Sequence, residues 1–207
     1  WGWPFGSEES TLNACRAALA IRQAFEPHSS PLSRAVPPGT LKDFRVGIGI
    51  AHGRAVAGKI GTSDRVSVTV FGPVVNLASR LETMTKQLRA SILLDEATAG
   101  IVRQKLCAAD GRIRKLGRVQ PYGLETPLLV SELLPPASEL PELTDDHLKQ
   151  YEAGVDAFIA GDWETAYAHL HAMPACDRAQ DFLTLRIAEH NRIAPPGWDG
   201  VIKLPGK

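Results

Sequence analysis

Residues 45–82 read RVGIGIAHGRAVAGKIGTSDRVSVTVFGPVVNLASRLE, and the hydrophobic period of the chain changes within this stretch. From Phe44, apolar residues alternate with small or polar ones, which predicts a strand that ends at the turn 52–54. The segments 55–60 and 66–71 follow, separated by a second short turn. Because parallel neighbours need a long crossover, the short turns predict antiparallel pairing of three strands.

A helix is predicted directly after the third strand. Gly72-Pro73 ends the strand, and proline is well tolerated in the first turn of a helix. An apolar stripe then runs at helical spacing through about residue 89, made by Leu77, Leu81, Met84 and Leu88. Asn76 and Arg80 are four residues apart beside this stripe, so both side chains should lie at the rim of the sheet.

Outside this stretch the pattern mixes helices and strands. A helix is predicted over 8–25, a proline-rich loop over 26–40, and a helix over 96–106 with Asp95 as its cap. Short β-like segments are predicted at 91–94, 113–119 and 127–133. This mixture predicts an α+β sheet domain rather than a helical bundle.

A second, helical part follows a proline-containing linker at 135–143. Residues 144–207 carry an amphipathic helix ending at Gly161, a second helix capped by Asp162 and a third opened by Asp177. The pattern resembles one tetratricopeptide-like hairpin, and no second copy follows at the ~34-residue period. Because such repeats need about three copies to stand alone, we expect this unit to pack on the sheet domain, with an irregular tail anchored by Trp198.

Composition narrows the classes of function. The 207 residues carry 23 basic and 23 acidic side chains, whereas a duplex-binding domain normally has a basic excess, so nucleic acid is not expected as a partner. Three cysteines without C-x-x-C spacing predict neither a disulfide framework nor a zinc site, and favour the cytoplasm. The six histidines lack metal-ligand spacing.

The first residues, Trp1-Gly2-Trp3-Pro4-Phe5, include no initiator methionine and read as the interior of a longer protein. No apolar run approaches the roughly 18–20 residues that span a bilayer, so this stretch is expected to make no membrane contact. The chain is therefore interpreted as a fragment, and its localisation is expected to be cytoplasmic, whether or not the complete protein is membrane-tethered. The question of a regulatory domain upstream of Trp1 is left open by these residues.

Asn76 and Arg80 have side chains suited to phosphoryl chemistry. Arginine offers a planar fork of donors for developing negative charge, and asparagine can orient a ribose oxygen. The spacing alone does not decide the matter, since this pair is common on solvated helices.

The wider pattern resembles the catalytic domain of class III nucleotidyl cyclases. Residues 45–61 resemble the family's strand pair, written R-V-G-I-x-x-G-x-V-x-A-G-x-x-G, and residues 68–82 resemble the signature (F/W)-G-x-x-V-N-x-A-S-R-(L/M)-E. Both stand in the family's order, and the resemblance covers about residues 1–134. It implies a ferredoxin-like α+β fold with an antiparallel sheet and packed helices.

The resemblance also implies roles for individual residues. Asn76 and Arg80 are the catalytic pair, with Asn76 on the ribose and Arg80 stabilising charge on the phosphate. Thr69 matches the base-reading position and, with Val70 beside it, belongs to the substrate-binding set. A threonine at this position resembles the pattern of a bacterial subgroup of adenylyl cyclases. Arg45 matches an arginine that reaches the terminal phosphates in some members.

Two departures from the family pattern stand out. The two aspartates that hold the divalent ions, Mg²⁺ or Mn²⁺, are expected upstream of Trp1, so no metal ligand is assigned within the chain. The late signature, often K-G-K, reads Tyr122-Gly123-Leu124, and leucine replaces a lysine expected on the triphosphate. Arg118 or another basic side chain would have to compensate.

The resemblance implies conversion of ATP to 3′,5′-cyclic AMP and pyrophosphate at the interface of a head-to-tail homodimer. Leu124 and the expected upstream position of the aspartates motivate an alternative, a catalytically silent cyclase-homology module for regulation and dimerisation. A guanylate cyclase and an interaction protein working through the helical hairpin are further alternatives.

Overall fold

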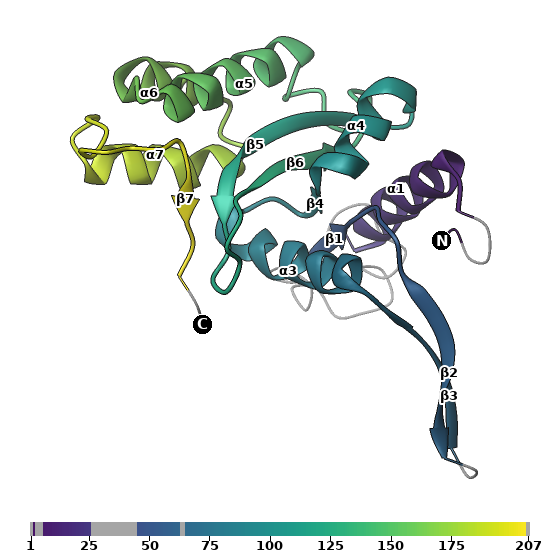
Figure 1. The fold of residues 1–207 in the computed structure, drawn as a ribbon. Coiled ribbons are helices and arrows are strands. Elements are labelled where there is room, and N and C mark those ends of the chain that lie inside the picture. The colour runs from purple at the N-terminus through teal and green to yellow at the C-terminus, as the bar shows by residue number, and fades with distance from the viewer. Residues whose placement is uncertain (1, 3–5, 26–44, 63–64, 206–207) are drawn as a thin grey trace, which may run out of the picture.

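The computed structural model describes residues 2, 6–25, 45–62 and 65–205 (Figure 1). The predicted proline-rich loop and all of the opening Trp1–Phe5 segment except Gly2 lie outside the described residues. The elements along the chain are α1 (Glu8–Ala24), β1 (Ile48–Ile50), β2 (Val56–Thr62), β3 (Arg65–Phe71), α3 (Pro73–Leu88), β4 (Ile92–Leu94), α4 (Glu96–Lys105), β5 (Arg112–Gln120), β6 (Leu128–Leu134), α5 (Asp145–Ala160), α6 (Trp163–His171), α7 (Ala179–Glu189) and β7 (Ile202–Lys203).

A five-stranded sheet in the order β1-β4-β6-β5-β7 separates two helical layers (Figure 1). Alternation along β4 shows the two faces, because Ile92 and Leu94 pack with α1 and α4, whereas Leu93 packs with α3 and the C-terminal helices. The predicted α+β class is confirmed. The sheet is mixed rather than antiparallel, since β1 pairs with β4, and β5 with β7, in the parallel direction.

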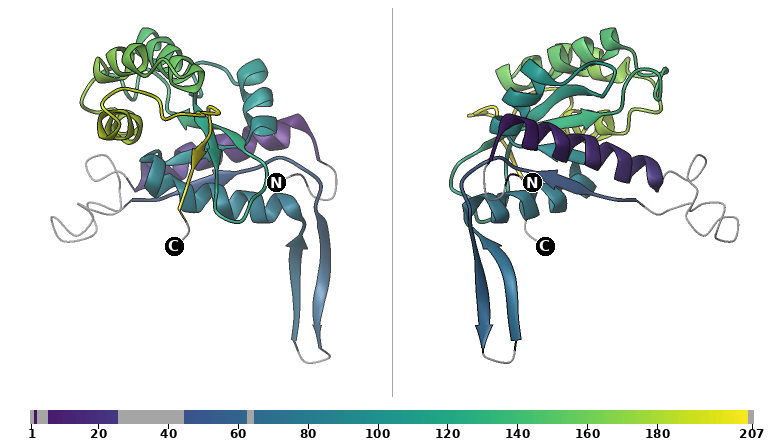
Figure 2. Two further views of the ribbon diagram at one scale, coloured as in Figure 1. Left: turned by 60° about the vertical axis from the view of Figure 1, so that its left-hand side comes forward. Right: turned by 90° about the vertical axis from the view of Figure 1, so that its right-hand side faces the viewer.

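The predicted pairing of three consecutive strands was wrong in one respect. β2 and β3 form an antiparallel hairpin, as expected, but β1 pairs with β4 instead of with this hairpin. The physical reason is that the hairpin and α3 together supply the long crossover that parallel strands need between β1 and β4. The hairpin leaves the body of the molecule as a separate two-stranded arm in every view (Figures 1 and 2).

Two glycines, Gly49 of β1 and Gly47 just before it, let this segment lie directly against α3. A Cβ atom at Gly49 would stand 2.2 Å from the carbonyl oxygen of Ala78 and 2.5 Å from the amide nitrogen of Glu82. A Cβ atom at Gly47 would stand 2.2 Å from the hydroxyl oxygen of Thr85. Neither glycine has a positive φ, so their role is close approach rather than backbone conformation.

The C-terminal helices share the core of the sheet domain, as expected. Thr144 caps α5 in a capping box with His147, Gly161 ends that helix in the left-handed conformation, and Asp162 caps α6. Tyr151, Phe158 and other buried residues of these helices belong to the same apolar cluster as Leu81 of α3. The segment predicted as a linker also folds against the sheet, with Leu143 buried.

The tail departs from the prediction of an irregular segment. Trp198 anchors it as expected, because its indole Nε1 donates to the carbonyl oxygen of Phe158 at 2.9 Å. Beyond Trp198, however, β7 adds a parallel strand at the edge of β5. A two-residue strand carries no detectable periodicity, which is why the sequence pattern gave no sign of it.

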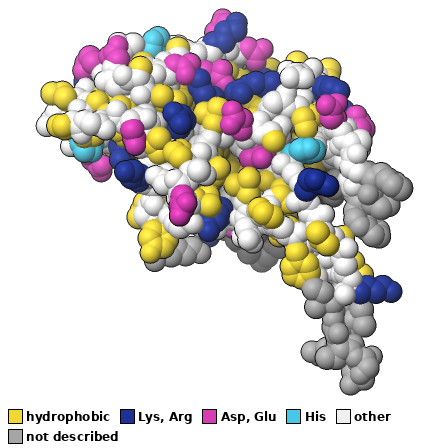
Figure 3. All heavy atoms as spheres, in the orientation of Figure 1, with side chains coloured by type: hydrophobic (Ala, Val, Ile, Leu, Met, Phe, Trp, Pro, Cys, Tyr) yellow, Lys and Arg dark blue, Asp and Glu magenta, His cyan; other side chains and the backbone are white. Residues whose placement is uncertain are grey.

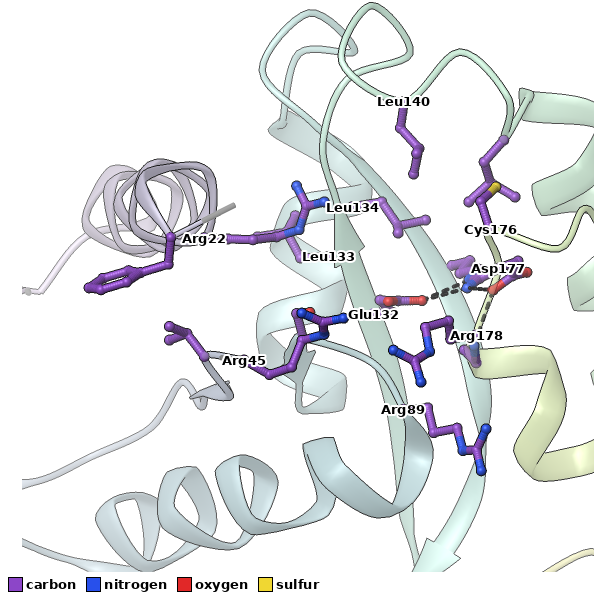
Figure 4. A pocket seen from close by; sticks show the side chains of 16 residues that line it. Arg22, Arg45, Arg89, Glu132, Leu133, Leu134, Leu140, Cys176, Asp177 and Arg178 are labelled. Carbon is purple, nitrogen blue, oxygen red and sulfur yellow. Dashed lines mark hydrogen bonds and ion pairs between the residues drawn. The ribbon is translucent and has the colours of Figure 1, made fainter. Parts of the chain in front are cut away.

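A buried arginine joins the sheet to the C-terminal helices. Arg114 of β5 donates to the carboxylate of Glu132 at 2.7 and 2.9 Å and to that of Asp177 at 2.5 and 2.6 Å (Figure 4). The ring of Tyr151 lies 4.1 Å from its guanidinium carbon. Burial alone would lower the pKa of Arg114, but attraction to Glu132 and the hydrogen bonds to Asp177 raise it, so the guanidinium stays charged.

Among the described residues, no helix is both long and apolar enough to cross a membrane.

Replacing Gly49 tests the contact between β1 and α3. We expect Gly49→Ala to lower the free energy of unfolding by about 1–3 kcal/mol. The added methyl group would overlap backbone atoms of α3, which cannot rotate away as a flexible side chain could. Gly58→Ala is the matched control, since a Cβ there meets nothing within 4 Å. Urea unfolding of the 207-residue chain measures both, and equal losses would contradict the assignment.

Replacing Asp177 tests the buried ion pairs. Asp177→Asn keeps the shape but places an amide against a guanidinium, so we expect a loss of about 3–5 kcal/mol in the free energy of unfolding. Asp146→Asn removes the same charge from an exposed pair with Lys149 and should change the stability by less than ~0.5 kcal/mol. A small loss at Asp177 would mean that the buried network contributes little.

Candidate functional site

The candidate site is built on the first turns of α3. β3 ends at Phe71 and the helix begins at Pro73, so one residue joins the hairpin to the helix. That residue, Gly72, has φ +149°, and a Cβ atom there would stand 3.1 Å from the carbonyl oxygen of Arg54. The base of the hairpin and the start of the helix are therefore held in close contact.

Asn76 and Arg80 lie one turn apart on α3, as the spacing predicts. Asn76 is exposed, and Arg80 is half-buried. The Nη1 atom of Arg80 donates a hydrogen bond to the carbonyl oxygen of Tyr122 at 2.7 Å. The helix therefore presents an open amide and a guanidinium that is held on one side by the loop between β5 and β6.

The guanidinium of Arg80 borders a pocket of about 290 Å³ at the end of the sheet. The pocket is lined by residues from three regions, namely Ser79, Arg80, Thr83, Met84 and Gln87 of α3, Pro121 and Tyr122 of the loop, and Leu204 and Pro205 of the tail. Gly123 has φ +76°, and a Cβ atom there would lie 3.8 Å from both Nη atoms of Arg80. The loop backbone therefore lies directly against the arginine head.

Leu124 belongs to the same loop, so the position expected to carry a lysine does lie near Arg80. Its amide donates to the carbonyl oxygen of Pro121 at 3.1 Å, and its side chain is half-buried. Arg118, the suggested substitute, is exposed on β5, where it is paired in register with Leu129. Arg118 is not among the residues that line the pocket of Arg80.

Thr69 and Val70 lie on β3 in the projecting hairpin (Figure 1). In the register of the hairpin, Thr69 is opposite Gly58 and Val70 is opposite Ala57. Thr69 is half-buried and Val70 is exposed. Because Gly58 has no side chain, the Thr69 hydroxyl faces no bulky neighbour across the pair.

The structure does not bring Arg45 to the catalytic pair. Arg45 precedes β1 and lines a pocket of about 430 Å³ together with Arg89, Arg114 and Arg178 (Figure 4). Arg80 lines a different pocket, with Tyr122 and the tail. Within one chain, these two arginines therefore line different pockets.

Within the described ranges, no three His, Cys, Asp or Glu side chains gather in a way that could hold a metal ion. The carboxylate of Asp95 next to β4 is engaged in structure, because it accepts from the amides of Thr98 at 3.0 Å and His52 at 3.3 Å. The imidazole of His52 in turn lies 3.0 Å from the hydroxyl of Thr11. These residues fix α1 and α4 around the end of β1.

Two features of the site could not be read from the sequence. The carbonyl oxygen of Tyr122 holds Arg80, and Leu204 of the tail lines the same pocket. A backbone carbonyl leaves no signature in side-chain patterns, and the tail lies far from α3 in sequence. The only hint was the glycine at 123, which suits the positive φ that this loop requires.

Comparisons with known proteins bear on this arrangement. The family model described as "Adenylate and Guanylate cyclase catalytic domain" matches residues 5–120. Adenylate cyclase 1 of Rhizobium meliloti is 34% identical over 134 residues, which are 65% of this chain and 19% of that protein. The adenylate cyclase of Anabaena cylindrica is 34% identical over 105 residues, which are 51% of this chain and 20% of that protein.

The fold is similar to that in the crystal structure of the adenylyl cyclase CyaB from P. aeruginosa, with a TM-score of 0.52 and 20% identity. The match covers 65% of this chain and 64% of that one, and at this identity it supports the fold alone. The chain spans about a fifth of the length of the two curated relatives. The loop after residue 120 and the C-terminal helices lie outside the matched family region.

Proposed function

We propose, since the chain belongs to the family of adenylate and guanylate cyclase catalytic domains, that it forms part of a site that converts ATP to 3′,5′-cyclic AMP and pyrophosphate. The observation that carries the proposal is the placement of Asn76 and Arg80 on α3, with Arg80 held by the carbonyl oxygen of Tyr122 at 2.7 Å beside an open pocket. The other N–H groups of the guanidinium have no hydrogen-bond partner within the part of the chain that the structure describes, so they could bind a phosphate.

In the proposed reaction the ribose 3′-oxygen attacks the α-phosphorus. A bond forms between these atoms, the bond from phosphorus to the oxygen of pyrophosphate breaks, and the 3′-hydroxyl proton passes to solvent water. Negative charge builds on the phosphoryl oxygens during attack, and the guanidinium of Arg80 stabilises it. The amide of Asn76, exposed one turn earlier, orients the ribose so that the 3′-oxygen is in line.

Thr69 is proposed to read the base, and its hydroxyl suits adenine because it can both donate and accept a hydrogen bond. Its place opposite Gly58 leaves room for a flat ring at this point of the hairpin. Val70 would contribute apolar contact beside it. Adenylate cyclase relatives support ATP as the substrate.

A head-to-tail homodimer is proposed because one chain separates the residues assigned to one substrate. Arg45 and Arg80 line different pockets, so a single triphosphate could meet both only if they came from two copies. Large apolar side chains are also exposed on the hairpin and at the start of α3: Val56, Val68, Val70, Phe71 and Val75. Figure 3 shows hydrophobic side chains gathered over this region, as expected of a surface that a second copy covers.

Two divalent ions are proposed as cofactors by family membership, and they would supply charge neutralisation on the triphosphate. The described residues do not offer a set of ligands for them. We propose that the carboxylates lie in a segment preceding Trp1, and the roles given to Asn76, Arg80 and Thr69 do not depend on the ions.

Product formation by the full-length protein tests the proposal. With Mn²⁺ we expect cyclic AMP from ATP and little cyclic GMP from GTP, and Arg80→Ala or Asn76→Ala should lower kcat by about 10²–10³-fold. Lys86→Ala, which removes an exposed cation from the same helix, is the control and should leave kcat unchanged. No product, with no effect of Asn76→Ala on any measured property, would favour the silent regulatory module, for which Leu124 is the motivating residue.

Mixing variants tests the shared site. Arg45→Ala and Arg80→Ala should each be inactive alone, but a mixed dimer keeps one of its two sites intact. Random pairing makes about half of the dimers mixed, so activity should return to about a quarter of the wild-type value. The control mixes Asn76→Ala with Arg80→Ala. In the proposed dimer one copy supplies both residues to a given site, so each site of a mixed dimer lacks one of them and none is intact. Equal recovery in both mixtures would exclude the proposed arrangement.

A further inference from the structure

We infer that the C-terminal strand β7 and the side chain of Gln120 position Arg80 by fixing the loop 121–125. This inference rests on the proposed function, because it assigns a purpose to the placement of Arg80. It also goes beyond the family resemblance, since β7 lies outside both the matched region 5–120 and the resembling residues 1–134.

The first step is the attachment of the tail to the end of β5. β7 pairs with β5 in parallel, with Ile202 opposite Val119 and Lys203 opposite Gln120. One residue further, the amide of Leu204 donates to the carbonyl oxygen of Gln120 at 2.9 Å. Ile202 and Leu204 are buried, so the tail is bound by packing as well as by hydrogen bonds. The end of β5 is thereby fixed at the point where the loop begins.

Gln120, the last residue of β5, contacts the far end of the loop through its side chain. Its Nε2 atom donates to the carbonyl oxygens of Leu124 at 2.9 Å and Glu125 at 3.1 Å. The loop also closes on itself through the amide of Leu124 and the carbonyl oxygen of Pro121. Gln120 therefore holds the far end of the loop to the strand that the tail braces.

The third step joins the loop to the catalytic helix. The carbonyl oxygen of Tyr122 accepts the hydrogen bond from Nη1 of Arg80, while the side chain of Tyr122 is 76% exposed and gives the loop little anchorage of its own. Leu204 and Pro205 line the same pocket. Because the arginine side chain is long and flexible, a fixed carbonyl on one side limits where its remaining donors point.

The opposite reading is that the loop and the tail sequester Arg80 and hold the site inactive. The geometry favours positioning, because one N–H group of the guanidinium is engaged by a neutral carbonyl and the described residues that line the pocket include no carboxylate. An inhibitory contact would be expected to neutralise the charge that the reaction needs. The two readings predict opposite changes in turnover when the loop is released.

Gln120→Glu is the decisive variant, since it keeps the size of the side chain but turns the donor toward Leu124 and Glu125 into an acceptor. In the full-length protein we expect kcat for cyclic AMP formation to fall roughly tenfold with KM nearly unchanged. Gln104→Glu, the same chemical change at an exposed position of α4, should have no effect. A rise in kcat would overturn the inference in favour of sequestration.

A double-variant cycle separates positioning from a general structural effect. If Gln120 acts through Arg80, Gln120→Glu should lower the residual activity of an Arg80→Ala protein by less than twofold, about the limit of a resolvable effect. A further tenfold fall in that background would mean that Gln120 supports the site by another route. Leu204→Pro, which removes the amide that donates to Gln120, should reproduce the Gln120→Glu effect, whereas Leu204→Ala keeps that amide and should be milder.

Hydrogen exchange of the 207-residue chain gives a readout that needs no turnover. The amides of residues 122–125 should exchange faster in Gln120→Glu than in the wild type, and not in Gln104→Glu. Unchanged exchange would refute the bracing of the loop. If exchange responds while the wild-type protein forms no cyclic nucleotide, the proposed function fails and the bracing stands, so the two failures are distinct.

Discussion

The absence of side chains at Gly47 and Gly49 is the constraint on which the position of the site depends. Because these residues let β1 touch the backbone of α3, the helix is fixed at its closest distance to the sheet. The helix carries its polar pair on the side away from that contact, with Asn76 exposed and Arg80 half-buried at the end of the sheet. Two glycines, one inside β1 and one just before it, thus help to determine where the guanidinium lies, although neither is near it in sequence.

The C-terminal helices extend this arrangement instead of forming a separate body. Arg114 lies in the sheet, yet half of its hydrogen bonds go to Asp177, which lies two residues before the start of α7. Replacing such a network with apolar side chains can be neutral or stabilising, so its value lies less in net stability than in fixing one arrangement of sheet and helices. This arrangement places the tail at the edge of β5, beside the loop that contacts Arg80.

Local sequence patterns predicted the helices and strands but not all of the pairings between them. The alternation at 66–71, the proline at 73 and the caps at Asp95 and Asp162 predict their elements, because each signal acts within a few residues. The pairing of β1 with β4 was missed, since it depends on a crossover of about forty residues that only packing decides. The residues of the site were reached through resemblance, whereas the contact of Arg80 with a backbone carbonyl has no sequence signature.

Leucine at position 124 changes how the charge at this rim is distributed. Among the described residues that line the pocket of Arg80, the arginine alone is charged, and Arg118 is not one of them. In the proposed reaction, Arg80 is the cation that this chain places at the phosphoryl group, so the stabilisation it gives to the developing charge falls as the guanidinium is displaced. A chain that carries leucine here therefore has more to gain from a loop held at both ends, which is the arrangement that Gln120 and β7 provide.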